Sequence, residues 1–169
     1  MMKGNLNHDE VLAEISEIRK AHILRKKKEQ EVKEKLGNES PALQAFVVFE
    51  IPDSTVAKIC GFSQQSVSNW RIGKQKIPDY AQLVMGEVLH LFMQDFLSDY
   101  DDPGFAWEGI SEEDEEAQRK QFQDNLKPKR DYLEALLNLQ SDIIAKIPTS
   151  EKIRALSHLK KLEEENGIS

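Results

Sequence analysis

The chain has 169 residues, 31% of them charged and 7% aromatic, and its formal net charge is -7. This length allows one globular domain with appendages or two small domains. The acidic balance argues against a protein that coats nucleic acid indiscriminately. It does not argue against a sequence-specific DNA-binding protein, because there the position of the positive charge matters more than the total.

Several classes of protein have no signal in the sequence. The first residues lack an apolar segment and no run is long enough to cross a membrane, so we expect a cytoplasmic protein without membrane contact. The single cysteine, Cys60, is expected as a small core residue without disulfide or thiol chemistry. The histidines show no metal-ligand spacing and no nucleophile or phosphate-loop motif occurs, so we expect no enzyme, no metal and no cofactor.

Apolar residues recur with helical spacing along the chain, which predicts an all-α fold. A first long helix is predicted over residues 7–36, with Asn7 or Asp9 near its start and Gly37 past its end. Its stripe begins with Val11, Ile15, Ile18 and His22. The basic run at residues 25–28 is either an arm that contacts phosphates or a solvated face, and we favour the solvated face because acids follow it directly.

A short helix is predicted next, with Ser40 as its cap, Pro41 as its first residue and the apolar segment 42–50 after it. Its Val-Val-Phe run is also compatible with a strand. Asp53 can cap the helix that follows.

Residues 54–71 have the pattern of two short helices joined by a tight turn. Ala57 is a small residue where the helices would cross, and Gly61 suits the turn between them. Val67 and Trp70 supply apolar contacts on the inner face of the second helix, which Ser63 can cap. The spacing predicts a helix-turn-helix, in which one helix lies in the DNA major groove.

The outward face of this second helix consists of amides and hydroxyls. A helix that is merely solvated would more often carry Glu and Lys, which have higher helix propensity than Ser and Asn. Gln and Asn can bind adenine through two hydrogen bonds, so the face favours base recognition over a plain polar surface. The residues of this face are Gln64, Gln65, Ser66, Ser68 and Asn69.

A loop over residues 72–78 follows and is locally basic. Lys74 and Lys76 flank Gln75 there, and Arg71 ends the preceding helix. Lysines beside a recognition helix contribute sequence-independent affinity by contacting the sugar-phosphate backbone. Positive charge in this segment of an acidic chain strengthens the prediction of DNA binding.

The remaining segments are predicted to be helical, with one linker. A helix from Pro78 to about Ser98 carries more apolar surface than a small core needs, and we expect the excess both to cover the N-terminal helix and to form a dimer seam. Residues 99–109 are predicted to be a loop from their Pro-Gly pair and their acids, and a linker is favoured over a calcium-binding loop because the ligand spacing and closing glutamate of the latter are absent. Phe105 and Trp107 are expected to pack back on the core.

Three further helices are predicted after the linker. The first begins with the capping box at Ser111 and ends near Leu126, since Lys127-Pro128 interrupts it. The second spans residues 132–147, and the third follows Pro148 and ends near Gly167. We expect the last two to form an αα-hairpin whose exposed apolar side needs a partner.

Residues 54–78 resemble the Cro/CI family of phage-type repressors, also called the XRE family. The matching pieces are Val56-Ala57, Gly61 to Val67, Trp70, Gly73-Lys74 and Lys76-Ile77-Pro78. The resemblance covers at most about 45 residues. It implies a lambda-repressor-like helix-turn-helix domain, to which this chain adds a long N-terminal helix and a C-terminal helical extension.

The resemblance also implies roles for individual residues. Gln64 and Gln65 would contact base edges and an adjoining phosphate, and Ser66 and Asn69 would be further groove contacts. Lys74 and Lys76 would hold phosphates. Where family members often have a phosphate-binding Gln the chain has Asp53, so we expect Ser54, Thr55 or backbone amides to serve instead. The full predicted DNA-binding set is Ser54, Thr55, Ser63, Gln64, Gln65, Ser66, Ser68, Asn69, Arg71, Lys74, Gln75 and Lys76.

The sequence therefore predicts three regions: a long helix at residues 1–37, a DNA-binding domain at 38–100, and a helical dimerisation or partner-binding region at 101–169. The main hypothesis is a dimeric transcriptional regulator, a repressor that binds a palindromic operator in double-stranded DNA. The alternative is the DNA-binding antitoxin of a toxin–antitoxin pair, with a toxin or an anti-repressor as protein partner. A third is an interaction protein whose helix-turn-helix no longer binds DNA.

Overall fold

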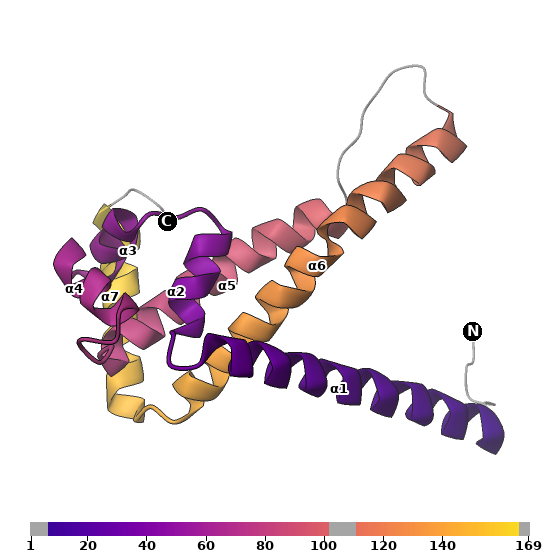
Figure 1. Cartoon of the computed structure of the whole chain (residues 1–169), viewed down its shortest axis with the longest axis horizontal. Coiled ribbons are helices and arrows are strands. Elements are labelled where there is room, and N and C mark those ends of the chain that lie inside the picture. Colours follow the sequence, from indigo (N-terminus) through magenta and orange to yellow (C-terminus); the bar gives the residue numbers. More distant parts are fainter. Residues whose placement is uncertain (1–6, 102–110, 166–169) are drawn as a thin grey trace.

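A computed structural model describes residues 7–101 and 111–165 of the chain (Figure 1). These residues form seven helices and no strand, so the predicted all-α class is confirmed. The helices are α1 (His8–Leu36), α2 (Pro41–Val48), α3 (Asp53–Cys60), α4 (Gln64–Arg71), α5 (Asp79–Asp101), α6 (Glu112–Ala145) and α7 (Thr149–Glu165).

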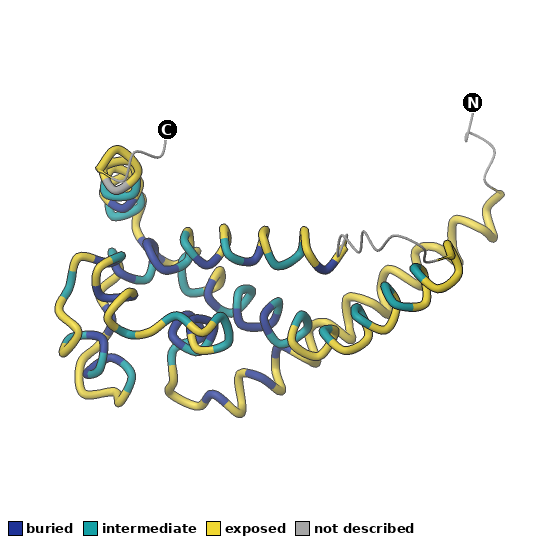
Figure 2. Tube along the Cα trace, turned by 90° about the horizontal axis from the view of Figure 1, so that it is seen from above, coloured by how far each residue is buried: buried dark blue, intermediate teal, exposed yellow. Residues whose placement is uncertain are grey.

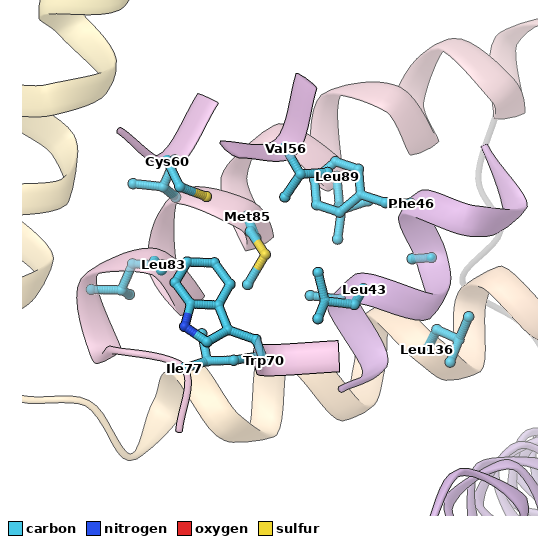
Figure 3. Close-up of a cluster of buried hydrophobic side chains, with 14 of the residues drawn as sticks. Leu43, Phe46, Val56, Cys60, Trp70, Ile77, Leu83, Met85, Leu89 and Leu136 are labelled. Carbon is cyan, nitrogen blue, oxygen red and sulfur yellow. The ribbon is translucent and has the colours of Figure 1, made fainter. Parts of the chain in front are cut away.

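The helices α2 to α5 surround one hydrophobic core, which α6 and α7 extend (Figure 1). The helix α5 packs against α2, α3, α6 and α7, while α6 also contacts α2 and α1. Figure 3 shows the centre of the core, where Leu43, Phe46 and Val56 lie around Met85 and Leu89. All five side chains are at most 1% exposed, so their burial supplies much of the hydrophobic stabilisation.

Two helical arms project from this core on the same side, away from α3 and α4 (Figure 1). One is the exposed N-terminal part of α1, residues 8–28, which we call the arm of α1. The other is the first part of α6. Of the residues of α1, only Glu29, Val32 and Leu36 are buried, all near its end (Figure 2). The arm of α1 is therefore a helix with little contact to the rest of the chain.

Four of the helices begin at a side-chain cap, as the sequence predicts. Asn7, Ser40, Ser63 and Ser111 each accept a hydrogen bond from a backbone N–H of the first turn. The predicted cap at Asp53 is wrong. Pro52 precedes α3 without a side-chain cap, because the Asp53 carboxylate binds Arg71 instead.

The segment after Pro41 is helical, so its alternative as a strand is excluded. The helix ends at Val48, earlier than predicted, because Glu50 adopts φ 61° and its neighbour Ile51 donates to the carbonyl of Phe46 at 2.9 Å. A residue with positive φ that closes a helix in this way is usually glycine.

The predicted break at Lys127-Pro128 is wrong, since α6 runs through Pro128. A proline inside a helix removes one hydrogen bond, but packing on both sides can hold the helix together. Before the proline, Gln123 Nε2 donates to the carbonyl of Tyr100 at 2.9 Å. After it, Arg130 lies 5.0 Å from the Tyr100 ring and Leu133 is fully buried. Pro128 itself is exposed.

The last two helices do not form the predicted hairpin. The helix α7 packs along α5, whereas α6 uses its apolar stripe on α5 and α2. The helix α5 does not cover α1 as predicted, because α6 packs against the end of α1. The helix α5 also continues to Asp101, into the predicted linker, while residues 102–110, with the predictions for Phe105 and Trp107, lie outside the described part of the chain.

Candidate nucleic-acid interface

The helices α3 and α4, with the residues 61–63 that join them, form a compact unit that we call the α3–α4 unit. Val56 and Ala57 of α3 and Val67 and Trp70 of α4 are buried on its inner face. The ring of Phe62, between the helices, meets the Trp70 ring edge to face with the centroids 5.1 Å apart. The two helices are therefore fixed on the core by one continuous apolar surface.

The turn between the helices depends on Gly61, which adopts the left-handed conformation with φ 75° and ψ 31°. The N–H of Phe62 donates to the carbonyl of Ala57 at 3.0 Å, which closes α3. This arrangement satisfies carbonyls that a helix end leaves without partners, and it favours glycine at the left-handed position. The glycine predicted for a tight turn is confirmed in that position.

Ser63 begins α4. Its Oγ accepts from the N–H of Ser66 at 3.1 Å and lies 3.0 Å from the Ser66 hydroxyl. Both hydroxyls are thereby occupied in fixing the first turn of the helix. Ser63 and Ser66 of the predicted set have a structural role that the sequence assigned to Ser63 alone.

The exposed face of α4 is made of amides and hydroxyls. Gln64 and Gln65 are exposed, and Ser66 and Ser68 are half-buried beside them. No acidic residue lies in α4. The face offers several donors and acceptors without a formal charge, which is what the edges of base pairs require.

Asn69 does not lie on this face. It is 8% exposed, and its Oδ1 accepts from Gln65 Nε2 at 3.1 Å. An amide nitrogen has two hydrogens, so Gln65 keeps one donor and its acceptor oxygen for a ligand. The structure thus departs from the prediction for Asn69, which orients Gln65 instead of pointing outward. Helical spacing alone placed it at the edge of the face and could not show this bond.

Arg71 at the end of α4 is bound to Asp53 at the start of α3. Its Nη2 lies 2.5 Å from Oδ1 and its Nε lies 3.3 Å from Oδ2. Such a two-point pair fixes the guanidinium and neutralises its charge. Asp53 therefore has two effects on the predicted site. It replaces a residue that could bind phosphate, and it pairs with Arg71, which belongs to the predicted DNA-binding set. Ser54 and Thr55 beside it are exposed, as their proposed role requires.

The loop after α4 is held by the backbone of Asn69. The carbonyl of Asn69 accepts from the N–H of Lys74 at 2.9 Å and from that of Gln75 at 3.2 Å. Gly73 turns the chain with φ 76°, and Ile77 returns to the core. The side chains of Lys74, Gln75 and Lys76 are all exposed beside α4.

The charges around the α3–α4 unit differ from those of the arms. Lys58, Lys74 and Lys76 are exposed, and none of them forms an ion pair with an acid in the described residues. The acidic first turn of α6 lies at the opposite end of the molecule (Figure 1). The described part of this end therefore has exposed positive charge beside an uncharged helix face.

Two residues near the unit were not singled out from the sequence. Ile72 is an apolar residue that is 74% exposed between α4 and the basic loop. His158 of α7 lies behind the turn, with Nε2 3.1 Å from the carbonyl of Ile59 and its ring 5.1 Å from that of Tyr80. The helix α7 thus supports the α3–α4 unit from behind. Only the fold brings His158 there.

Other kinds of site find little support in the structure. Within residues 7–101 and 111–165, no group of His, Cys, Asp or Glu side chains could hold a metal ion. No helix in the same residues is long and apolar enough to span a membrane. Comparison of the chain with protein families, curated proteins and solved structures found no match. The α3–α4 unit is the site to which both the sequence pattern and the side-chain geometry point.

Proposed function

We propose that the chain is a sequence-specific DNA-binding transcriptional regulator, a repressor that acts as a dimer on a palindromic operator. In this proposal α4 is the recognition helix of a lambda-repressor-like helix-turn-helix domain, and the resemblance of residues 54–78 to the Cro/CI family supports it. Gln64 and Gln65 contact base edges, and Lys74 and Lys76 contact phosphates.

The observation that carries the proposal is the exposed face of α4. Its amides and hydroxyls have no acid among them, and a rigid apolar contact holds the helix from behind. Helices that enter the major groove contact base edges with residues near their N-terminus, and Gln64 and Gln65 are the first two residues of α4. The basic loop next to them suits the sugar-phosphate backbone.

The hydrogen-bonded residues refine the proposed roles. Gln65 is held by Asn69, so its remaining donor and acceptor are already oriented before DNA arrives. This lowers the entropy that is lost on binding. Asn69 is therefore proposed as a positioning residue. Ser63 and Ser66 direct their hydroxyls into the first turn, and Arg71 reaches a phosphate only by leaving Asp53.

One observation favours the alternative of an antitoxin. The arm of α1 exposes large apolar side chains, including Ile18 at 62% and Ile23 at 64%. An antitoxin would use such an arm to bind a toxin while its helix-turn-helix represses the operon. The two functions share the DNA-binding face and differ in what covers the arm.

The proposal is tested by selecting bound sequences from random DNA duplexes and then measuring affinity against salt concentration. Lys74→Ala should weaken all duplexes alike and reduce the slope of log K against log salt by about 1. Gln65→Ala should lose about 1–3 kcal/mol of discrimination at one base pair of each half-site. The two effects separate phosphate contacts from base contacts.

Lys127→Ala is the matched control, because Lys127 is an exposed lysine of α6, outside the α3–α4 unit and the basic loop. It changes the net charge by the same amount as Lys74→Ala. Equal losses for the two variants would mean that total charge and not the basic loop causes binding. A protein that enriches no sequence and shows no salt-sensitive binding would rule out the proposed function.

A further inference from the structure

The arm of α1 carries an apolar stripe that continues an interface within the chain. At the C-terminal end of α1, where this helix packs against α6, Val32 and Leu36 are 3% and 7% exposed. Glu29 is also buried there, and its Oε1 accepts from Asn138 of α6 at 2.9 Å. The stripe that makes these contacts has the alternating spacing of three and four residues that pairs helices side by side.

The same spacing runs back along the arm, where no other helix covers it. The series 11, 15, 18, 22, 25, 29, 32, 36 alternates steps of four and three residues; it is apolar at Val11, Ile15 and Ile18 and again at Val32 and Leu36, and polar at the three positions between them, His22, Arg25 and Glu29. Val11, Ile15 and Ile18 on this stripe are 37%, 40% and 62% exposed (Figure 2). Leu12 and Ile23 beside it are 51% and 64% exposed. A helix that projects from the body with this face uncovered is built to pair with another helix.

The charges of the arm are divided by position. Residues 8–18 contain Asp9, Glu10, Glu14 and Glu17 and no Lys or Arg. Residues 19–28 contain Arg19, Lys20, Arg25, Lys26, Lys27 and Lys28 and no acid. Two copies in parallel would place like charges against each other, whereas two antiparallel copies place the acidic segment of each against the basic segment of the other.

We infer that the arm of α1 pairs with the same arm of a second copy in antiparallel orientation, and that this pairing forms the dimer. It gives the basic run at residues 25–28 a partner, in place of DNA. It leaves α4 free, because the arm projects away from the α3–α4 unit (Figure 1). The inference rests on the proposed function only for the use of the dimer on DNA.

The first test is the oligomeric state of the full chain by sedimentation equilibrium without DNA. Ile15→Asp with Ile18→Asp should raise the dissociation constant of the dimer about a hundred-fold or more, because each change is present twice. Both side chains are exposed in one chain, so circular dichroism and the melting temperature should stay close to wild type at a concentration where both proteins are monomeric. Leu24→Asp is the matched control: Leu24 is 67% exposed on the same helix but lies about 120° around it from Ile18.

The second test exchanges the charges. Changing Glu10, Glu14 and Glu17 to Lys should leave that variant monomeric, and changing Arg25 and Lys28 to Glu should do the same. An equal mixture of the two should form a heterodimer. The same reversal of Glu112, Glu113 and Glu116 at the start of α6 should change nothing. Dissociation by this last variant would show that the arm pairs with α6 of the second copy and would overturn the inference.

The third test measures orientation by distances between spin labels attached at His8→Cys. Cys60 is buried and burial raises the pKa of its thiol to about 12, so it should not take the label. In an antiparallel pair centred near Ile18, the labels are about 30 Å apart at 1.5 Å per residue. In a parallel pair they are about 10 Å apart, the distance between packed helices.

Three results would overturn the inference: a wild-type chain that stays monomeric at about 100 μM, far above a micromolar dissociation constant; a dimer that survives the two Asp substitutions; and the short label distance. If the arm binds only a different protein, the chain alone stays monomeric, and this also overturns the inference. These measurements contain no DNA, so they can fail while base recognition by α4 holds. A sound dimer that selects no DNA sequence would reject the proposed function alone.

Discussion

The α3–α4 unit and the arm of α1 are both built from amphipathic helices, but only the unit completes its apolar contacts within the chain. Trp70 in α4 is 5% exposed, whereas Ile18 in the arm is 62% exposed. Two helices of only eight residues are stable here because they share one core with α5. The arm, more than twice as long, has its apolar stripe uncovered. Length and pattern make a helix, and its position in the fold decides whether its apolar side is used internally.

The two regions should differ most in how much stability is lost when an apolar side chain is removed from each. Trp70→Ala removes a large buried side chain that packs against Phe62 and should lower the free energy of unfolding by about 3–5 kcal/mol. Ile18→Ala removes apolar atoms that are exposed in one chain, so it should change the stability of the monomer by at most about 0.5 kcal/mol. Urea unfolding at a concentration where the chain is monomeric measures both.

A similar loss for the two variants would mean that the arm is folded onto the body in solution. The same measurement repeated at a concentration where dimers form should separate them in a second way. There Ile18→Ala should become destabilising, because burial in the dimer adds to the stability of the folded chain.

The contrast between the two regions also marks what the sequence could and could not predict. The helix boundaries at Asn7, Ser63 and Gly61 were predictable because caps and left-handed glycines act locally. The exposed face of α4 was predictable from its composition. The burial of Asn69 was not, because composition does not show that its side chain binds Gln65 of the same helix. The pairing of Arg71 with Asp53 was not, because it depends on a contact between two helices.

The errors in the second half of the chain have the same origin. Pro128 was expected to end a helix, since local propensity disfavours proline in a helix interior. Packing against Tyr100 of α5 on both sides of it carries the helix through. The predicted hairpin of α6 and α7 failed because sequence adjacency does not show which neighbour buries a stripe. The apolar stripe of α6 packs against α5 and α2.

The pH dependence of stability should report how well the α3–α4 unit excludes water from Cys60. Cys60 is 1% exposed, and burial raises the pKa of its thiol from 9.0 to about 12. Above pH 9 the unfolded chain loses this proton while the folded chain keeps it, so the folded state binds more protons and stability falls as pH rises. The thiol should therefore reduce stability by about 1.4 kcal/mol per pH unit between pH 9 and 12.

The measurement is the stability of wild type minus that of Cys60→Ala, from urea unfolding at several pH values above 8. The difference removes the titration of lysines and tyrosines that both proteins share. A thiol placed on the arm by His8→Cys in the Cys60→Ala background provides the opposite case, because it is exposed and should add no such slope. If the wild-type difference is also independent of pH, then Cys60 is accessible and the unit opens readily.

The smallest expected effect compares the end of α2, beside the α3–α4 unit, with the end of α1. Glu50 closes α2 with φ 61°, and Gly37 closes α1 with φ 59° and ψ -115°. A side chain costs energy at positive φ and glycine does not, and the cost is higher for the ψ of Gly37, which lies outside the left-handed region. Glu50→Gly should therefore raise the free energy of unfolding by about 0.5–1 kcal/mol, and Gly37→Ala should lower it by about 1 kcal/mol or more.

Both changes can be read from melting temperatures and urea midpoints. Nothing lies within 4 Å of a Cβ added at Gly37, so its loss would report backbone conformation alone. A stabilising Glu50→Gly with a neutral Gly37→Ala would mean that the end of α1 relaxes when strained, as a weakly held arm can. Losses of stability in both variants would show that the Glu50 side chain has a favourable role that outweighs its strained backbone.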